Sequence, residues 1–281
     1  MQRRRVVQGV AVPGFLYGTA WKEERTEELT RLALAAGFLG IDTANQRRHY
    51  VEDAVGSAVA SALGEGRVRR EDLFLQTKFT FVRGQDNRIP YDPAADEADQ
   101  VGQSFASSLA HLRTDHVDSY LLHGPSSPRG VTRADWAAWR AMEALQRAGR
   151  ARLIGVSNVS LGQLAAIRRG SEVAPAFVQN RCFSSTGWDR EVRAYCGEHG
   201  IAYQAFSLLT ANPRALRSPP VARAARRAGR SAAQVVFRFA IEVGMIPITG
   251  TSRLAHMRDD LGCFDFALDP AEVEAIERAG G

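Results

Sequence analysis

Short apolar runs alternate along the chain with longer segments in which apolar residues recur every three or four positions. Apolar runs of about four to eight residues, bounded by Gly, Pro or Asp, are typical of buried strands. The sequence predicts eight such strands, over residues 14–20, 40–44, 73–79, 117–124, 153–158, 177–180, 202–209 and 245–250. The spacing leaves room for a helix after each strand.

The segments between these runs have helical periodicity. In the first of them Leu29, Leu32, Ala33 and Ala36 share one face, and Gly37 marks the end of the helix. Similar patterns predict three further helices that begin their apolar faces at Val55, Val101 and Trp136, and others near 161–168 and 189–199. A helix is also predicted over 219–242, with a break at Gly229, and a last one over 270–279 that starts at an Asp-Pro N-cap. Strand and helix therefore alternate along the whole chain.

This alternation predicts an α/β fold, the closed parallel (β/α)8 or TIM barrel, as a single domain over residues 1–281. One barrel of this kind usually takes about 250 residues. Residues 3–13, RRRVVQGVAVP, predict a β-hairpin that turns at Gly9 and closes the bottom of the barrel. No GxGxxG motif follows the first strand, which disfavours a Rossmann domain.

The composition is that of a globular protein, with 45% hydrophobic and 24% charged residues. No apolar stretch of about 18 residues is present, so we expect no membrane span. The first residues, MQRRRVVQGV, lack the apolar core of a signal peptide. Cys182, Cys196 and Cys263 form no CxxC pair and suit a reducing compartment. We therefore expect a cytoplasmic protein.

The net charge of +5 comes from basic residues spread along the chain. No aromatic residues interleave with them for base stacking, so nucleic-acid binding is not expected. Of the 36 basic residues only Lys22 and Lys78 are lysines. Only lysine approaches neutrality near pH 7 when it is desolvated. The retention of Lys78 in a predicted strand therefore points to a specific role.

Catalytic groups of such barrels gather at the carboxyl ends of the strands. Asp42, Lys78 and His123 lie at the ends of three successive predicted strands, and Tyr50 follows Asp42 in a loop. A buried ammonium beside a tyrosine lowers the pKa of the phenol, and a carboxylate keeps the ammonium charged. A histidine stabilises an oxygen on which negative charge develops. This set suits protonation of a carbonyl oxygen, and no metal cluster or obvious nucleophile accompanies it.

Taken singly, these residues have ordinary structural explanations. Asp42 fits a turn cap, His123 a core histidine, Tyr50 an exposed loop residue and Lys78 a surface lysine. Their common placement at one rim of the predicted barrel favours the functional interpretation.

The segments GIDTA, FLQTKF, SYLLHGP, MEALQRAGRARLIGVSN, FVQN and FDFALDPAEVEAIE resemble those of the aldo-keto reductase family. The resemblance runs from about residue 14 to residue 279, and the MEALQRAGRARLIGVSN stretch is its most specific part. It implies a (β/α)8 barrel, a nicotinamide cofactor bound across the rim, and reversible reduction of carbonyl compounds.

The resemblance implies a catalytic tetrad of Asp42, Lys78, His123 and Tyr50. Members of the family usually place the tyrosine five residues after the aspartate. In this chain Arg47 has that position and Tyr50 stands eight residues after Asp42, which indicates a three-residue insertion in the loop.

The resemblance also implies NADPH as the cofactor, with NADH as an alternative. The expected cofactor-binding residues are Thr19, Asp42, Ser157, Asn158, Gln179, Phe206, Ser207, Leu209, Thr249, Gly250, Thr251, Arg253 and His256. Ser157, Asn158 and Gln179 match residues that hold the nicotinamide amide, and Phe206 replaces a tyrosine that stacks on the ring. In ITGTSRLAHM the family's phosphate-binding lysine is absent. The remaining backbone N–H groups and Arg253 are expected to form the anion site there.

Trp21, Phe79 and Phe183 are expected to line an apolar pocket for small aldehydes or ketones. The chain ends soon after its last predicted helix, so we expect an open pocket and loose specificity. No partner besides the carbonyl substrate is implied, and nothing in the sequence indicates an oligomeric state.

Two other functions remain open. The altered Tyr50 loop keeps a non-catalytic, redox-sensing subunit of the same fold as an alternative. A barrel aldolase that uses Lys78 as a Schiff-base nucleophile is the second, although Ser157, Asn158 and Gln179 argue against it.

Overall fold

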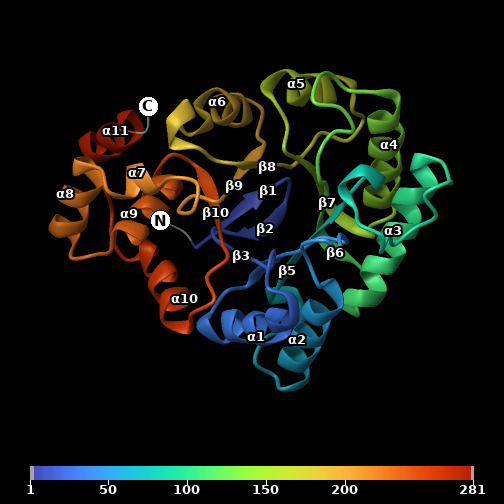
Figure 1. The fold of residues 1–281 in the computed structure, drawn as a ribbon, viewed down its shortest axis with the longest axis horizontal. Coiled ribbons are helices and arrows are strands. Elements are labelled where there is room, and N and C mark those ends of the chain that lie inside the picture. The colour runs from blue at the N-terminus through green and yellow to red at the C-terminus, as the bar shows by residue number, and fades with distance from the viewer. Residues whose placement is uncertain (1–2, 280–281) are drawn as a thin grey trace.

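The computed structural model describes residues 3–279, which form a closed barrel of eight parallel strands (Figure 1). In order around the barrel these are β3 (Leu16–Gly18), β4 (Gly40–Asp42), β5 (Phe74–Phe79), β6 (Val117–Leu122), β7 (Ala151–Ser157), β8 (Phe177–Arg181), β9 (Ala202–Phe206) and β10 (Met245–Thr249), which pairs with β3. All eight predicted strands and the barrel are confirmed. The ends of the expected domain, residues 1–2 and 280–281, lie outside the described residues.

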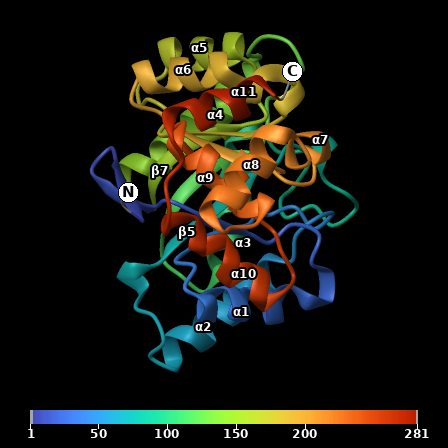
Figure 2. The same ribbon diagram turned by 90° about the vertical axis from the view of Figure 1, so that its left-hand side faces the viewer.

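Helices surround the barrel on its outside (Figure 1). They are α1 (Thr26–Ala36), α2 (Glu52–Gly64), α3 (Glu97–Leu112), α4 (Arg133–Arg147), α5 (Leu161–Gly170), α6 (Arg190–Glu198), α7 (Pro213–Leu216), α8 (Pro219–Ala228), α9 (Ala232–Glu242), α10 (Leu254–Leu261) and α11 (Pro270–Arg278). Figure 2 shows α8, α9 and α10 together on one side of the barrel.

The helix boundaries follow the predicted signals. Gly37 ends α1 with a left-handed φ of 108°. Gly229 separates α8 from α9 in the same conformation, with φ 62°, which confirms the predicted break. Asp269 caps α11, and Glu272 completes a capping box with it.

Some boundaries differ from the sequence prediction. The strands predicted over 14–20 and 202–209 are shorter, at Leu16–Gly18 and Ala202–Phe206, because the chain leaves the ladder for the rim loops. The short helices α7 and α10 were not predicted, since neither carries an extended apolar stripe. Helix α10 matters for the site because it starts directly after the expected anion-binding loop.

The predicted hairpin is confirmed as β1 (Arg4–Val7) and β2 (Val10–Pro13), with Gly9 in its turn at φ 80°. Val7, Val10 and Val12 are buried against the first residues of barrel strands, among them Phe74 and Phe177. The hairpin therefore closes the amino-terminal end of the barrel (Figure 2, left). At the opposite end of the barrel, where the strands finish, the loops that follow the strands form the rim.

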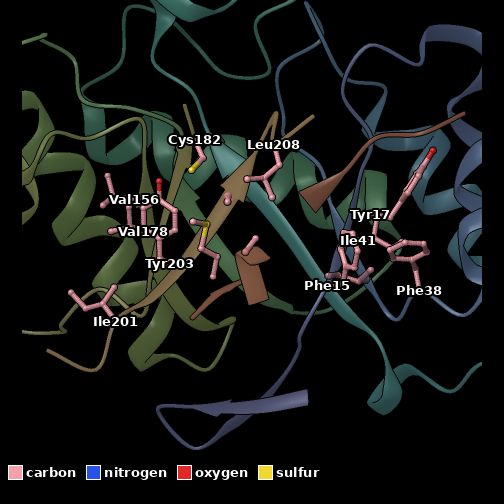
Figure 3. Close-up of a cluster of buried hydrophobic side chains, with 14 of the residues drawn as sticks. Phe15, Tyr17, Phe38, Ile41, Val156, Val178, Cys182, Ile201, Tyr203 and Leu208 are labelled. Atoms are coloured by element: carbon pink, nitrogen blue, oxygen red, sulfur yellow. The ribbon is translucent and has the colours of Figure 1, made fainter. Parts of the chain in front are cut away.

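A continuous apolar layer joins the barrel to its helices. Figure 3 shows Val156, Val178 and Tyr203 from neighbouring strands on one side, and Tyr17 with Phe38 on the other. Close packing of this kind leaves few alternative side-chain positions. The strands therefore form a rigid support for the polar residues at their carboxyl ends.

None of the helices within residues 3–279 has the length and apolarity that a membrane crossing needs. Cys182, Cys196 and Cys263 are free, buried thiols. Burial raises the pKa of each thiol to about 12. A thiol that stays protonated is a poor nucleophile, so these cysteines are core residues.

Candidate active site

The predicted tetrad residues lie together at the carboxyl ends of adjacent strands. Asp42 ends β4, Lys78 is the penultimate residue of β5, and His123 directly follows β6. Parallel pairing places Lys78 opposite Leu121, two residues before His123. The register of three short strands therefore brings residues far apart in sequence to one rim.

Lys78 and Asp42 form a buried ion pair. The Lys78 side chain is fully buried, and its Nζ donates to both carboxylate oxygens of Asp42, at 2.7 and 2.8 Å. A third hydrogen bond of 2.8 Å goes to the Thr43 carbonyl. Burial lowers the pKa of Lys78, while Asp42 acts in the opposite direction. All three ammonium hydrogens are thus engaged.

Tyr50 lies beside this pair in spite of the longer loop. Its ring centroid is 5.2 Å from the Lys78 Nζ and 5.9 Å from the centroid of the His123 ring. The loop is held by a turn in which the Gln46 carbonyl accepts from the Tyr50 N–H at 3.0 Å. Arg48 in this loop is exposed, while the Tyr50 ring stays at the rim beside Lys78.

One electrostatic expectation is corrected. We expected Lys78 to lower the pKa of Tyr50, yet burial raises it and the negative charge of Asp42 adds to the increase. The reason is that desolvation of a phenolate outweighs an ammonium whose hydrogens already point at Asp42 and Thr43. Tyr50 is accordingly protonated at neutral pH.

His123 is held as a neutral imidazole. Burial, with the positive charge of Lys78 as a smaller cause, lowers the pKa of His123 to about 3. Its Nδ1 lies 2.7 Å from the Thr80 hydroxyl, so Thr80 fixes the orientation of the ring. Thr80 was missed by the sequence analysis, although it directly follows β5, two residues after Lys78.

The expected pocket aromatics occupy different environments. Trp21 is 68% exposed, has a φ of 60°, and stacks on His49 with ring centroids 4.0 Å apart. Phe183 is 38% exposed. Phe79 is fully buried and packs on Tyr91 at 5.6 Å. Trp21 and Phe183 thus offer open faces, whereas Phe79 is a core residue with no exposed face for a ligand.

The residues matched to amide binding form one cluster. Ser157 is the last residue of β7, and its hydroxyl donates to the Gln179 carbonyl at 2.6 Å. Asn158 follows in the left-handed conformation, with φ 53°, and its amide donates to the His123 carbonyl at 2.7 Å. Gln179 is buried on β8. Within the described residues the side-chain oxygens of Asn158 and Gln179 accept no hydrogen bond.

Two further expected cofactor residues flank this cluster. The Thr19 hydroxyl donates to the Asp42 carbonyl at 3.0 Å and is fully buried, which ties β3 to β4. Phe206 ends β9, and the Arg181 guanidinium lies 5.8 Å from its ring centroid. Ser207 follows at a φ of 59°, in the loop that leads to Leu209.

The expected anion site lies between β10 and α10. Gly250 and Arg253 are exposed there, as is His256 in the first turn of α10. Thr251 accepts from the Arg253 N–H at 3.4 Å. The Lys22 ammonium donates to the Gly250 carbonyl, so a cation reaches this loop from the segment that follows the neighbouring strand β3.

Thr249 differs from the rest of this expected set. Its hydroxyl donates to a carboxylate oxygen of buried Asp260 at 2.8 Å, and burial raises the pKa of Asp260 to about 7. The Thr249 side chain is therefore engaged inside the protein.

Two buried glutamines beside Asp42 were also missed. Gln76 on β5 donates to Asp42 Oδ1 at 2.7 Å, and Gln204 on β9 accepts from Gln76 and from Gln179. Uncharged glutamines inside apolar strands gave no periodic signal. Only the closure of the barrel brings them together.

Known proteins are similar to this chain over nearly its whole length. The sequence model of the Aldo/keto reductase family matches residues 13–280. The oxidoreductase YtbE of Bacillus subtilis is 30% identical over 271 residues, which cover 96% of this chain and 89% of that protein. Glyoxal reductase of the same organism is 29% identical over 271 residues, with the same coverage of 96% and 89%.

A solved structure agrees with these relatives. The crystal structure of the Bombyx mori aldo-keto reductase AKR2E4 in complex with NADP superposes with a TM-score of 0.84 at 27% identity, over 98% of this chain and 92% of that one.

The carboxyl ends of the strands carry a buried Lys–Asp pair, a tyrosine and a neutral histidine. This is where (β/α)8-barrel enzymes have their active sites, so the fold and the site together define a barrel enzyme. Since the family model covers almost the entire chain, the chain belongs to the aldo/keto reductase family. It is accordingly an oxidoreductase, as the resemblance predicted.

Proposed function

We propose that this protein reduces small aldehydes and ketones to alcohols with NADPH, with NADH as an alternative cofactor. One observation carries the proposal: the centroid of the Tyr50 ring lies 5.2 Å from the Lys78 ammonium and 5.9 Å from the centroid of the His123 ring, in spite of the unusual spacing of Tyr50 in the sequence. The site therefore holds a proton donor beside a neutral hydrogen-bonding group.

The chain offers a fitting place for a nicotinamide amide. The free side-chain oxygens of Asn158 and Gln179 are acceptors for its N–H2 group. The half-buried Phe206 ring supplies a stacking face beside them. When bound, the cofactor supplies the hydride for the carbonyl carbon. The loop from Gly250 to Arg253 would hold its phosphates.

Residues of the protein supply the proton that the carbonyl oxygen takes up. Tyr50 is protonated at neutral pH and donates its phenolic hydrogen to the carbonyl oxygen, because the alkoxide formed there is the stronger base. Neutral His123 orients that oxygen by a hydrogen bond. Lys78, fixed by Asp42, is the cation beside the Tyr50 ring, and the strongly raised pKa of Tyr50 means that the phenolate left there is promptly reprotonated.

The mouth of the site supports a small carbonyl substrate. The exposed faces of Trp21 and Phe183 provide apolar contact. The name of the Bacillus subtilis relative, glyoxal reductase, is in line with small aldehydes. A Schiff base on Lys78 is less well supported, since its nitrogen has three hydrogen-bond partners.

The test is Tyr50→Phe, assayed by loss of NADPH absorbance against a panel of aldehydes and ketones. We expect turnover to fall by about a thousandfold or more, with the dissociation constant for NADPH changed less than about threefold. Tyr195→Phe is the matched control, because Tyr195 lies in α6 and stacks on His199, the residue that follows that helix. Wild-type protein that binds NADPH but turns over no carbonyl would instead favour the non-catalytic, redox-sensing function.

A further inference from the structure

The interior of the barrel carries a layer of buried amides directly under the site. Gln76 on β5 and Gln204 on β9 are separated by three intervening strands in either direction around the barrel, so they meet across its axis. Both side chains are fully buried. An unpaired amide in such a place costs several kcal/mol, so this pair must be well hydrogen-bonded to persist.

The two amides satisfy each other. Gln76 Nε2 donates to Gln204 Oε1 at 2.8 Å, and Gln204 Nε2 donates back to Gln76 Oε1 at 2.9 Å. Gln76 Nε2 also donates to Asp42 Oδ1, which can only accept, so the donor and acceptor atoms of both amides are fixed. Gln204 Oε1 therefore faces its remaining neighbour, Gln179, as an acceptor.

Gln179 is oriented by that acceptor. Its Nε2 donates to Gln204 Oε1 at 2.9 Å and to Asp42 Oδ1 at 2.9 Å, which uses both amide hydrogens. Gln179 Oε1 is the one atom of this amide without a partner among the described residues. A flip of the amide would break both bonds and place two oxygens against its own, so the orientation is strongly determined.

The same layer also supports the catalytic carboxylate. Asp42 Oδ1 accepts from Gln76 at 2.7 Å, from Lys78 at 2.7 Å and from Gln179 at 2.9 Å. Both hydrogens of the Gln76 amide are therefore donated, one to Asp42 and the other to Gln204. The position of the ion pair and the orientation of Gln179 depend on one connected network.

We propose that Gln76 and Gln204 are positioning residues which hold Gln179 with its oxygen toward the cofactor, so that the site selects a pyridine ring whose side group donates N–H. This positioning role rests on the proposed binding of a nicotinamide cofactor, and it explains why the site prefers a ring that carries a carboxamide. A carboxamide satisfies Gln179 Oε1, whereas a methyl ketone at the same ring position has no hydrogen to give.

The experiment compares binding of NADP⁺ with binding of its 3-acetylpyridine analogue, in which a methyl group replaces the amide nitrogen. Dissociation constants come from quenching of protein fluorescence, so no turnover is needed. Wild-type protein should bind NADP⁺ about tenfold more tightly, the worth of one well-made buried hydrogen bond. In Gln204→Met the Gln179 amide keeps its bond to Asp42 but loses the second one, so its oxygen is held less firmly toward the cofactor and the ratio should fall to about threefold or less.

Gln100→Met is the matched control, because Gln100 is buried in α3 and bonds only to backbone carbonyls of Pro93 and Ala95. It should keep the wild-type ratio. If Gln204→Met does not fold, Gln204→Asn replaces it, since the shorter amide cannot reach Gln76. A folded variant at Gln204 that keeps the tenfold ratio overturns the positioning role. Wild-type protein that binds neither dinucleotide defeats the proposed function itself.

Discussion

Replacement of Lys78 by methionine tests the buried ion pair most directly. The change removes three hydrogen bonds from Nζ and leaves the carboxylate of Asp42, which is 4% exposed, without its cation. Breaking a buried pair from one side costs about 3–5 kcal/mol. The amides of Gln76 and Gln179 still donate to Asp42, so we expect the lower end of that range.

A loss of about 3 kcal/mol in a domain of this size lowers the melting temperature by roughly 10 °C. Thermal unfolding followed by circular dichroism measures it. The decisive comparison is the double variant Lys78→Met with Asp42→Asn. It removes both charges, so most of the lost stability should return, to within about 1 kcal/mol of wild type. Turnover should stay lost in both variants.

Lys22→Met is the control, because Lys22 is the other lysine of the chain and lies partly exposed at the rim. It should cost less than about 1 kcal/mol. Single and double variants of equal stability would refute the reasoning, since the cost would then come from repacking around residue 78 and not from an uncompensated charge.

Three further changes test other parts of the structure. Thr80→Val removes the 2.7 Å contact to His123 Nδ1, so kcat/KM should fall about tenfold at unchanged cofactor affinity in steady-state kinetics. Gly56→Ala places a methyl group 1.9 Å from a backbone oxygen and should cost more than about 2 kcal/mol in denaturant unfolding. Gly64→Ala, with open space around it in the same helix, should be neutral or stabilising. Asp260→Asn should flatten the pH dependence of unfolding between about pH 4 and 7, because the raised pKa of Asp260 near 7 makes wild type lose roughly 4 kcal/mol as pH rises through that window.

Each of these has a clear opposite result. Weaker cofactor binding in Thr80→Val would assign Thr80 to binding. Equal destabilisation by the two alanine variants would contradict the close crossing of α2 and α3. A stability curve for Asp260→Asn that still falls between about pH 4 and 7 would place the responsible titration elsewhere.

Much of the fold was determined by local sequence. Strand runs such as LFLQTKF and apolar helical stripes predicted the barrel, because its strands are buried on both faces and its helices on one. The breaks at Gly37 and Gly229 were equally local, since both residues adopt positive φ. Lys78 and Asp42 were found by type and position at strand ends.

Tertiary structure alone decided how these residues meet. The spacing of Tyr50 left its position open, and only the turn at Gln46 returns its ring to Lys78. The direction of its pKa shift depends on desolvation, which no local pattern contains. Gln76 and Gln204 are 128 residues apart, and their contact exists only because the eighth strand pairs with the first. Closure of the barrel is a long-range event, so the polar layer that it creates was invisible to periodicity.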